Sequence, residues 1–210
     1  MALLVLTPRP MTSLAITQPR ATLEDMRRPD RPARYADIEA LPTGVVGQIL
    51  NGVLHTHPRP ASPHALASSA LGEELGPPFK RGKGGPGGWV ILDEPELHLG
   101  DDVLVPDLAG WRRERLPEVE DAPAIRLAPD WVCEVLSPST AGIDRVEKME
   151  IWAREGVPFV WHVDPGAKSL EIFEWNGTKW SRVAAHRGAL KVRARPFDAI
   201  ELDLAVLWAR

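Results

Sequence analysis

The stretch PDWVCEVL at residues 129–136 has the composition of a buried β-strand, with Trp, Val, Cys, Val and Leu side chains. Glu134 lies in the middle of this apolar run. A buried charge without a partner costs several kcal/mol, so such a residue is normally paired, neutralised or absent. Upstream, the stretch VLVPDLAG places Asp107 directly after another apolar run. Two acids in such positions indicate a site that uses them together.

The composition is that of an ordinary globular protein. The chain has 210 residues, 44% hydrophobic and 26% charged, which is enough for one domain with a full core. We predict a poorly ordered tail over residues 1–34 and one domain over residues 35–210. The net charge of −4 gives no general attraction to nucleic acid or to an anionic membrane, so any binding of phosphate has to be local.

The cysteine content and the hydropathy pattern indicate the cellular compartment. The single cysteine, Cys133, excludes an internal disulfide, and a reducing cytoplasm is the predicted compartment. No apolar run reaches the length of a membrane span, so no membrane partner is expected. Because Cys133 neighbours Glu134, its side chain points to the opposite face of the strand, where a buried apolar filler is expected.

Turn signals and hydrophobic periodicity predict an α+β fold, a mixed sheet flanked by helices. Asn51-Gly52 divides the stretch VVGQILNGVLH into a β-hairpin. Helical spacing over residues 64–75 closes at Gly76-Pro77-Pro78, and a second helix runs from Ser139 or Thr140 to about residue 155. Further strands are predicted at residues 89–92, 96–99, 159–163, 170–175 and 179–184.

Asp107, Glu134 and Lys148 form the candidate catalytic set. Adjacent strands would bring the two acids close together, and a divalent cation would relieve their repulsion. Mg²⁺ or Mn²⁺ suits this position, because Mg²⁺ prefers one or two carboxylates together with waters and phosphate oxygens. Lys148 comes four residues after Asp144 on the helix SPSTAGIDRVEKMEIWAREG. This spacing lets Asp144 hold the lysine while the lysine positions or activates a water.

A structural alternative explains the same residues without catalysis. Asp107 would cap a turn at the sheet edge, and Lys148 would be a solvated helix charge paired with Asp144. The position of Glu134 inside an apolar strand is what this alternative explains least well.

Four motifs together resemble the bacterial "putative restriction endonuclease" domain family of the PD-(D/E)xK nuclease superfamily. They are VPD at 105–107, EVLSPST at 134–140, D-x-x-x-K at 144–148 and GVPFVWHVDP at 156–165. The resemblance implies a restriction-endonuclease-like PD-(D/E)xK core and Mg²⁺-dependent hydrolysis of phosphodiester bonds. It also implies that Asp107, Glu134 and the main-chain carbonyl of Val135 hold the metal. Leu136 occupies the usual place of the family's lysine, and Lys148 matches the lysine that some members carry on the next helix.

The first hairpin departs from the family pattern. The family usually has E-x-x-D-G-E there, whereas this chain has QILNGV. Gln48 stands where an acidic ligand is expected, and Asn51 replaces the aspartate of the turn. A glutamine oxygen ligates without charge, so Gln48 is predicted to be a peripheral ligand. The alternative function is a catalytically inactive module with the same fold that binds nucleic acid or serves in assembly.

Two further residues are candidates for a supporting role. His64 matches a position where the family often carries histidine, and Glu94 is placed to contribute outer hydrogen bonds. His55 and His57 alternate on one strand face, which offers two metal nitrogens without a third ligand of suitable spacing. A polar strand face is therefore the expected role of these two histidines.

The predicted substrate is DNA. Four basic residues near the Asp107 strand are the predicted contacts for its backbone, namely Arg81, Lys83, Arg112 and Arg113. The sequence contains no base-reading module, so no sequence specificity is predicted. Members of the family commonly pair, and by this resemblance a hairpin carrying Trp175 and Trp180 is expected to support a homodimer.

Overall fold

The computed structural model describes residues 31–58 and 61–209. The predicted tail over residues 1–34 lies outside the described residues except for its last four. These last residues contact the domain, because Arg31 forms an ion pair with Asp37 and the Ala33 N–H donates to the carbonyl of Gly52. Among the described residues, no helix is long and apolar enough to cross a lipid bilayer.

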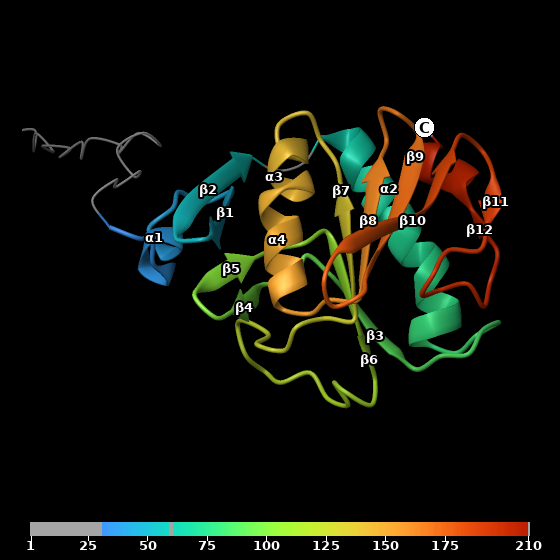
Figure 1. Ribbon diagram of the computed structural model, residues 1–210, viewed down its shortest axis with the longest axis horizontal. Helices are drawn as coiled ribbons and strands as arrows, with labels where there is room; N and C mark the ends of the chain where they lie inside the picture. The colour runs from blue at the N-terminus through green and yellow to red at the C-terminus, as the bar shows by residue number, and fades with distance from the viewer. Residues whose placement is uncertain (1–30, 59–60, 210) are drawn as a thin grey trace, which may run out of the picture.

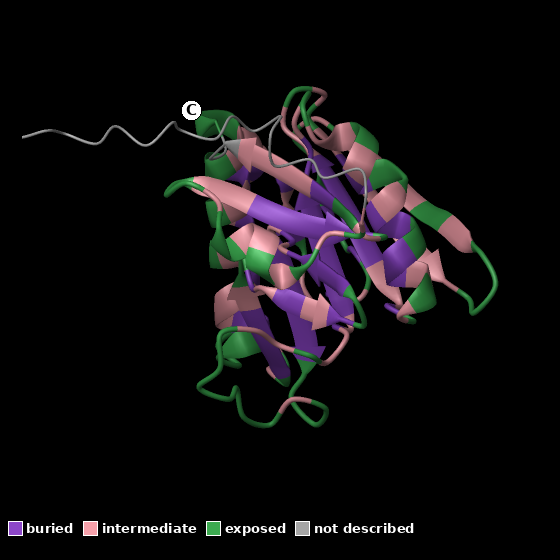
Figure 2. Ribbon diagram, turned by 90° about the vertical axis from the view of Figure 1, so that its left-hand side faces the viewer, coloured by how far each residue is buried: buried purple, intermediate pink, exposed green. Residues whose placement is uncertain are grey.

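A six-stranded mixed sheet forms the centre of the molecule, in the order β10-β9-β8-β7-β6-β3 (Figure 1). Strand β7 lies inside the sheet, parallel to β8 and antiparallel to β6. The strands are β3 (Trp89–Asp93), β6 (Leu108–Arg112), β7 (Trp131–Val135), β8 (Phe159–Asp164), β9 (Ser169–Trp175) and β10 (Trp180–Arg187). This is the predicted α+β arrangement, and the buried residues concentrate in these strands (Figure 2).

A second, four-stranded sheet has the order β2-β1-β5-β4 and carries the predicted hairpin. Its turn residues Asn51 and Gly52 have φ values of 51° and 77°, as the two-residue turns that favour Asn-Gly require. The helix α1 (Tyr35–Glu39) packs beside this sheet. The strands are β1 (Val45–Leu50), β2 (Val53–Pro58), β4 (Leu97–Leu99) and β5 (Asp102–Leu104).

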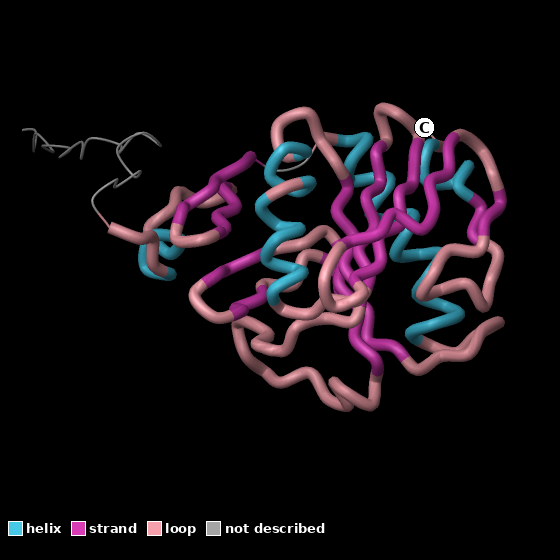
Figure 3. The backbone as a smooth tube through the Cα atoms, viewed as in Figure 1, coloured by secondary structure: helices cyan, strands magenta, loops and turns pink. Residues whose placement is uncertain are grey.

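Helices cover the two faces of the six-stranded sheet. The helix α2 (Ser62–Leu75) packs on one face, together with the 3₁₀ helix η2 (Leu204–Trp208) and the short strands β11 (Lys191–Val192) and β12 (Leu202–Asp203). The helices α3 (Ala141–Arg145) and α4 (Glu147–Arg154) lie on the other face. A long segment without regular structure joins β6 to β7 (Figure 3).

One helix prediction needs an addition and one needs correction. The α-helix α2 ends at Leu75, as predicted, and a π-helical turn, η1 (Gly76–Lys80), follows it and buries Phe79 with its ring 4.7 Å from that of Phe197. The second predicted helix is broken into α3 and α4 at Val146, whose φ and ψ of −122° and −75° are not helical. A short final strand is predicted near Ile200 and is found as β12, whereas its partner β11 was not predicted, and only two residues of each strand are paired.

Candidate active site

The pairing of β6 with β7 places the two predicted acids side by side. Leu108 pairs with Cys133, so Asp107 just before β6 comes next to the end of β7. The Val135 N–H donates to Asp107 Oδ2 at 2.7 Å, which fixes the aspartate against the strand that carries Glu134. The sequence prediction involved only the carbonyl of Val135, and this hydrogen bond from its N–H was missed.

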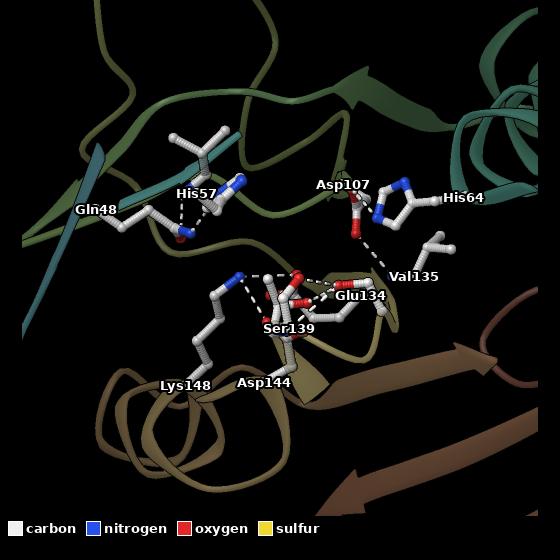
Figure 4. Close-up of polar contacts among 12 residues, drawn as sticks. Gln48, His57, His64, Asp107, Glu134, Val135, Ser139, Asp144 and Lys148 are labelled. Carbon is white, nitrogen blue, oxygen red and sulfur yellow. Dashed lines mark hydrogen bonds and ion pairs between the residues drawn. The ribbon is translucent and has the colours of Figure 1, made fainter. Parts of the chain in front are cut away.

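Lys148 reaches the same point from α4. Its Nζ lies 3.0 Å from Glu134 Oε2 and 3.0 Å from Asp144 Oδ1 (Figure 4). The three side chains are almost completely buried, with 1% of Glu134 and 3% each of Asp144 and Lys148 exposed. The structure therefore brings together the acids and the lysine that the sequence singled out, and Lys148 is not the solvated charge of the structural alternative.

These groups line one cavity of about 380 Å³. Its walls come from the β1–β2 hairpin, the turn after β3, the loop between β7 and α3, and the two helices α3 and α4. Within the described part of the chain, Glu134 Oε1 is buried and accepts no hydrogen bond. One carboxylate oxygen of the site thus has a free lone pair in a closed environment.

The electrostatics of the site centre on Glu134. Burial, helped by the nearby charges of Asp144 and Asp107, raises the pKa of Glu134 to about 8 against the opposing effect of Lys148. Burial alone would lower the pKa of Lys148, but Glu134, Asp144 and Asp107 together raise it well above its usual range. Three carboxylates therefore surround one ammonium, which leaves an excess of negative charge whenever Glu134 is ionised.

His64 also contacts the site, and it lies in the first turn of α2. Its Nε2 lies 3.1 Å from Asp107 Oδ1, so both oxygens of Asp107 have a partner. Burial lowers the pKa of His64, but the hydrogen bond and charge of Asp107 outweigh burial and raise it overall. The sequence placed His64 near the site, but a contact with Asp107, 43 positions further along the chain, had no local signal.

Gln48 and Glu94, the other predicted supporting residues, also line the cavity. The Gln48 Oε1 accepts a hydrogen bond of 2.9 Å from the Val105 N–H, and its Nε2 lies 3.3 Å from His57 Nε2. The amide therefore joins β1 to the segment just before Asp107. Glu94 lies in the turn after β3 with a φ of 44°, and its N–H donates to the carbonyl of Asp107.

A comparison with protein families gives a match over residues 32–206 to the Uma2 family, described as "Putative restriction endonuclease". The chain belongs to this family. Among solved structures, it is similar to the crystal structure of "a putative nuclease belonging to DUF820" from Anabaena variabilis, with a TM-score of 0.64 and 20% identity. That match covers 84% of this chain and 98% of the other, and it shows the same restriction-endonuclease-like fold. No curated protein matches the chain.

Membership of the Uma2 family supports a nuclease, and the residues of the cavity fit a hard divalent cation. Mg²⁺ needs only one or two carboxylates from the protein, with waters and phosphate oxygens as further ligands. Asp107 and Glu134 supply such carboxylates, and Glu134 Oε1 has a free lone pair inside the cavity. The described residues contain no group of three or more His, Cys, Asp or Glu placed for a metal that needs more protein ligands.

The four basic residues predicted to contact the DNA backbone lie at different distances from the cavity of this Uma2 domain. Arg81 lines a groove that shares His64 and Glu94 with the cavity. Arg112 is at the far end of β6 from Asp107, about 16 Å along the strand, with its guanidinium 4.1 Å from the ring centre of Trp89. The next residue, Arg113, donates to the carbonyl of Trp89. Lys83 is exposed in the loop after η1.

His162 is a buried residue of this region that sequence reasoning missed. It pairs with Glu134 across β7 and β8, and within the described residues neither ring nitrogen has a hydrogen-bond partner. Burial and the nearby Arg145 lower the pKa of His162 to about 4. The neutral ring lies 5.0 Å from that of Phe173 and adds no positive charge beside Glu134. Its only sequence signal is a histidine inside the apolar run FVWHV.

Proposed function

We propose that the protein is a metal-dependent endonuclease that hydrolyses phosphodiester bonds in DNA. The observation that carries the proposal is the convergence of Asp107, Glu134 and Lys148 on one cavity, with Glu134 Oε1 left without a hydrogen bond. Asp107 and Glu134 would hold Mg²⁺ or Mn²⁺, with the carbonyl of Val135 as a third donor. The cation would supply charge stabilisation at the phosphate and lower the pKa of a bound water.

The residues of the chain supply positioning and charge. A water oxygen attacks phosphorus and releases a proton to solvent, the bond from phosphorus to the leaving sugar oxygen breaks, and that oxygen takes up a proton from solvent. Because the pKa of Lys148 is raised, the ammonium stays protonated at neutral pH and acts as a donor to the water or to a phosphate oxygen. Asp144 holds Lys148 through the 3.0 Å ion pair, and the Val135 N–H with His64 holds Asp107.

A cleavage assay tests the proposal. The wild-type chain is incubated with plasmid and with single-stranded DNA in Mn²⁺, beside Asp107→Ala and an Asp101→Ala control. Asp101 is an exposed acid in the turn between β4 and β5, so its loss changes charge without touching the cavity. We expect cleavage by the wild type and by Asp101→Ala that stops with EDTA and is absent in Asp107→Ala. Equal cleavage by all three proteins would come from a contaminant and would overturn the proposal.

A second candidate function rests on Gln48. Both ends of this amide have partners within the protein, and it adds no negative charge to the metal site. A DNA-binding or assembly module that has lost catalysis would retain such a hydrogen bond while binding the cation weakly. Gln48→Glu separates the two functions, because the added carboxylate keeps an acceptor for the Val105 N–H. If the wild type binds DNA without cutting it and Gln48→Glu cuts, the second function describes the natural protein.

The predicted homodimer remains a proposal. Trp175 and Trp180 pair across the β9–β10 hairpin with ring centres 5.3 Å apart. Trp180 also donates from Nε1 to the Met149 carbonyl of α4, so part of this hairpin packs on its own domain. Light scattering after size-exclusion chromatography tests the pairing, and a mass of one chain at micromolar concentration would contradict it.

A further inference from the structure

The charged side chains of the candidate site lie below the molecular surface. Glu134, Asp144 and Lys148 are exposed by 3% or less, and they are reached through a cavity of about 380 Å³. This volume is at the lower end of the range for pockets that take small molecules. A phosphodiester group must therefore enter the cavity to meet these residues, together with the nucleotide that carries it.

The β1–β2 hairpin forms one wall of this cavity. It contributes five lining residues, namely Val46, Gln48, His55, Thr56 and His57. The opposite wall is the loop between β7 and α3, where Ser137 Oγ lies 3.0 Å from Ser139 Oγ and 2.9 Å from Thr140 Oγ1. Figure 4 shows Gln48 and His57 on one side of the site and Lys148 with Asp144 on another.

Polar contacts fix the hairpin to the rest of the domain. At its turn, the Asn51 N–H donates to Asp102 Oδ1 at 2.6 Å, and Asp102 forms an ion pair with Arg154 of α4. On β2, His55 Nε2 lies 3.1 Å from Glu147 Oε2, also on α4. The turn of the hairpin is thus held by the helix that carries Lys148, and the middle of β2 lies beside the same helix. We call these two contacts the hairpin latch.

The lining of the cavity itself carries few of the positive charges that hold an intact duplex. Proteins that grip duplex DNA neutralise several phosphates with Lys and Arg side chains. Of the described residues that line the cavity, Lys148 is the one lysine or arginine, and four acids line the same cavity, namely Glu94, Asp107, Glu134 and Asp144. Arg112 and Arg113 are engaged with Trp89 at the other end of the β3–β6 pair.

We infer that the site takes single-stranded DNA, with one nucleotide inserted under the hairpin, in preference to an intact duplex. This inference rests on the proposed function and names its substrate class. A duplex is stiff over many base pairs, so it cannot bend one phosphate into a walled cavity without unpairing. A single strand turns freely about its backbone and delivers a splayed nucleotide at lower cost.

The test compares circular single-stranded DNA with a relaxed, covalently closed duplex circle of the same sequence in Mn²⁺. In parallel, fluorescence anisotropy in Ca²⁺ measures binding of a labelled oligonucleotide, single-stranded or paired to its complement. We expect faster cleavage and tighter binding of the single strand by about tenfold or more, because the duplex must first be unpaired at the nucleotide that enters the cavity.

The outcomes separate the inference from the proposed function. Tighter binding of the single strand without cleavage supports the inference and overturns the nuclease. Equal or faster cleavage of the closed duplex overturns the inference and supports the nuclease. Neither binding nor cleavage of either DNA overturns both.

Variants of the hairpin latch test the cause of the preference. Arg154→Ala removes the ion pair with Asp102, and Glu147→Ala removes the contact with His55, while neither residue lines the cavity. We expect either variant to lower the ratio of single-strand to duplex cleavage several-fold. Arg195→Ala is the matched control, because Arg195 is 55% exposed against 49% for Arg154 and pairs with Glu174, away from the hairpin. A ratio unchanged in both folded latch variants would overturn the role of the hairpin.

Discussion

The two faces of β7 differ in chemistry although both are buried. Trp131, Cys133 and Val135 pack on the face covered by α2, where the Trp131 ring lies 5.3 Å from that of Trp161 and 4.8 Å from that of Phe197. Val132 and Glu134 alternate with them and point toward α4. One face is an aromatic core, and the other ends in a carboxylate whose pKa is raised to about 8.

Neighbouring residues of β7 therefore differ in role, because one face serves stability and the other carries the candidate site. The aromatic face contributes apolar burial and close packing, which stabilise the fold without any chemistry. The polar face holds ionisable groups out of water, which costs stability and leaves groups poised for a cation. Variants of the two faces should therefore have opposite effects on stability and on activity.

The largest expected effect is on catalysis at the polar face. Asp107→Asn keeps the shape and the hydrogen bond from the Val135 N–H but removes the charge that would hold the cation. Under the proposed function, the rate of DNA cleavage should fall by about a hundredfold or more, since electrostatic stabilisation of this kind contributes two to three orders of magnitude. The melting temperature, followed by circular dichroism, should change little. An Asp107→Asn protein as active as the wild type would break the comparison.

The next effect is on stability at the aromatic face. Phe197→Ala removes the ring that contacts Phe79, Trp89, Trp131 and Trp161. Unfolding in urea should show a loss of about 3–5 kcal/mol. The folded fraction should still respond to Mn²⁺, because the polar face is intact. If Phe197→Ala abolished the response to Mn²⁺ in folded protein, the two faces would not be independent.

A divalent cation should stabilise the polar face. Saturating Mn²⁺ relieves the repulsion among the carboxylates and binds the folded state alone, so the melting temperature should rise by roughly 5 °C or more. Differential scanning fluorimetry with and without EDTA measures the shift. Glu134→Gln should lose most of it, and Glu118→Gln, at an exposed position, should keep it. A shift of equal size in Glu134→Gln would place the cation elsewhere.

The smallest effect is a pH dependence of stability without metal. The folded-state pKa of Glu134 is raised from 4.5 to about 8, so the folded protein retains a proton that the unfolded chain releases. This contribution to stability is complete below pH 4.5 and is lost as the pH rises toward 8. In EDTA, Glu134→Gln should therefore melt a few degrees above the wild type at pH 8, with the gap closing toward pH 4.5. A constant gap would contradict the buried ionisation of Glu134.

The sequence revealed the core of the site because its signals were local. Glu134 is conspicuous as an acid inside an apolar strand, and Lys148 follows Asp144 by four residues. The two side chains meet as this spacing predicts, although the helix breaks between them at Val146. The alternation of side chains along a strand also placed Cys133 correctly on the other face, where it is buried. The Asn51-Gly52 turn followed from the backbone conformation that only a few residues adopt readily.

The remaining contacts depend on packing between distant segments. Nothing near His64 in the sequence indicates Asp107, and nothing near Gln48 indicates the Val105 N–H. The sequence gives no sign that Arg112 has a partner, whereas the pairing of β3 with β6 places its guanidinium over the ring of Trp89. The π-helical turn η1 places Phe79 against Phe197, which comes from the other end of the chain, so no nearby residue indicates this contact.

The break in the helix at Val146 places Lys148 and Asp144 on two different helices, α4 and α3. Arg145 ties α3 to β9 through Glu171 at 2.7 Å, and this sets the place of Asp144. The helix α4 is seated independently by Ile151 and Trp152, both fully buried. The ion pair between Asp144 and Lys148 thus joins two separately anchored helices. The ammonium is held from β7 through Glu134 and from α3 through Asp144, at 3.0 Å in each case.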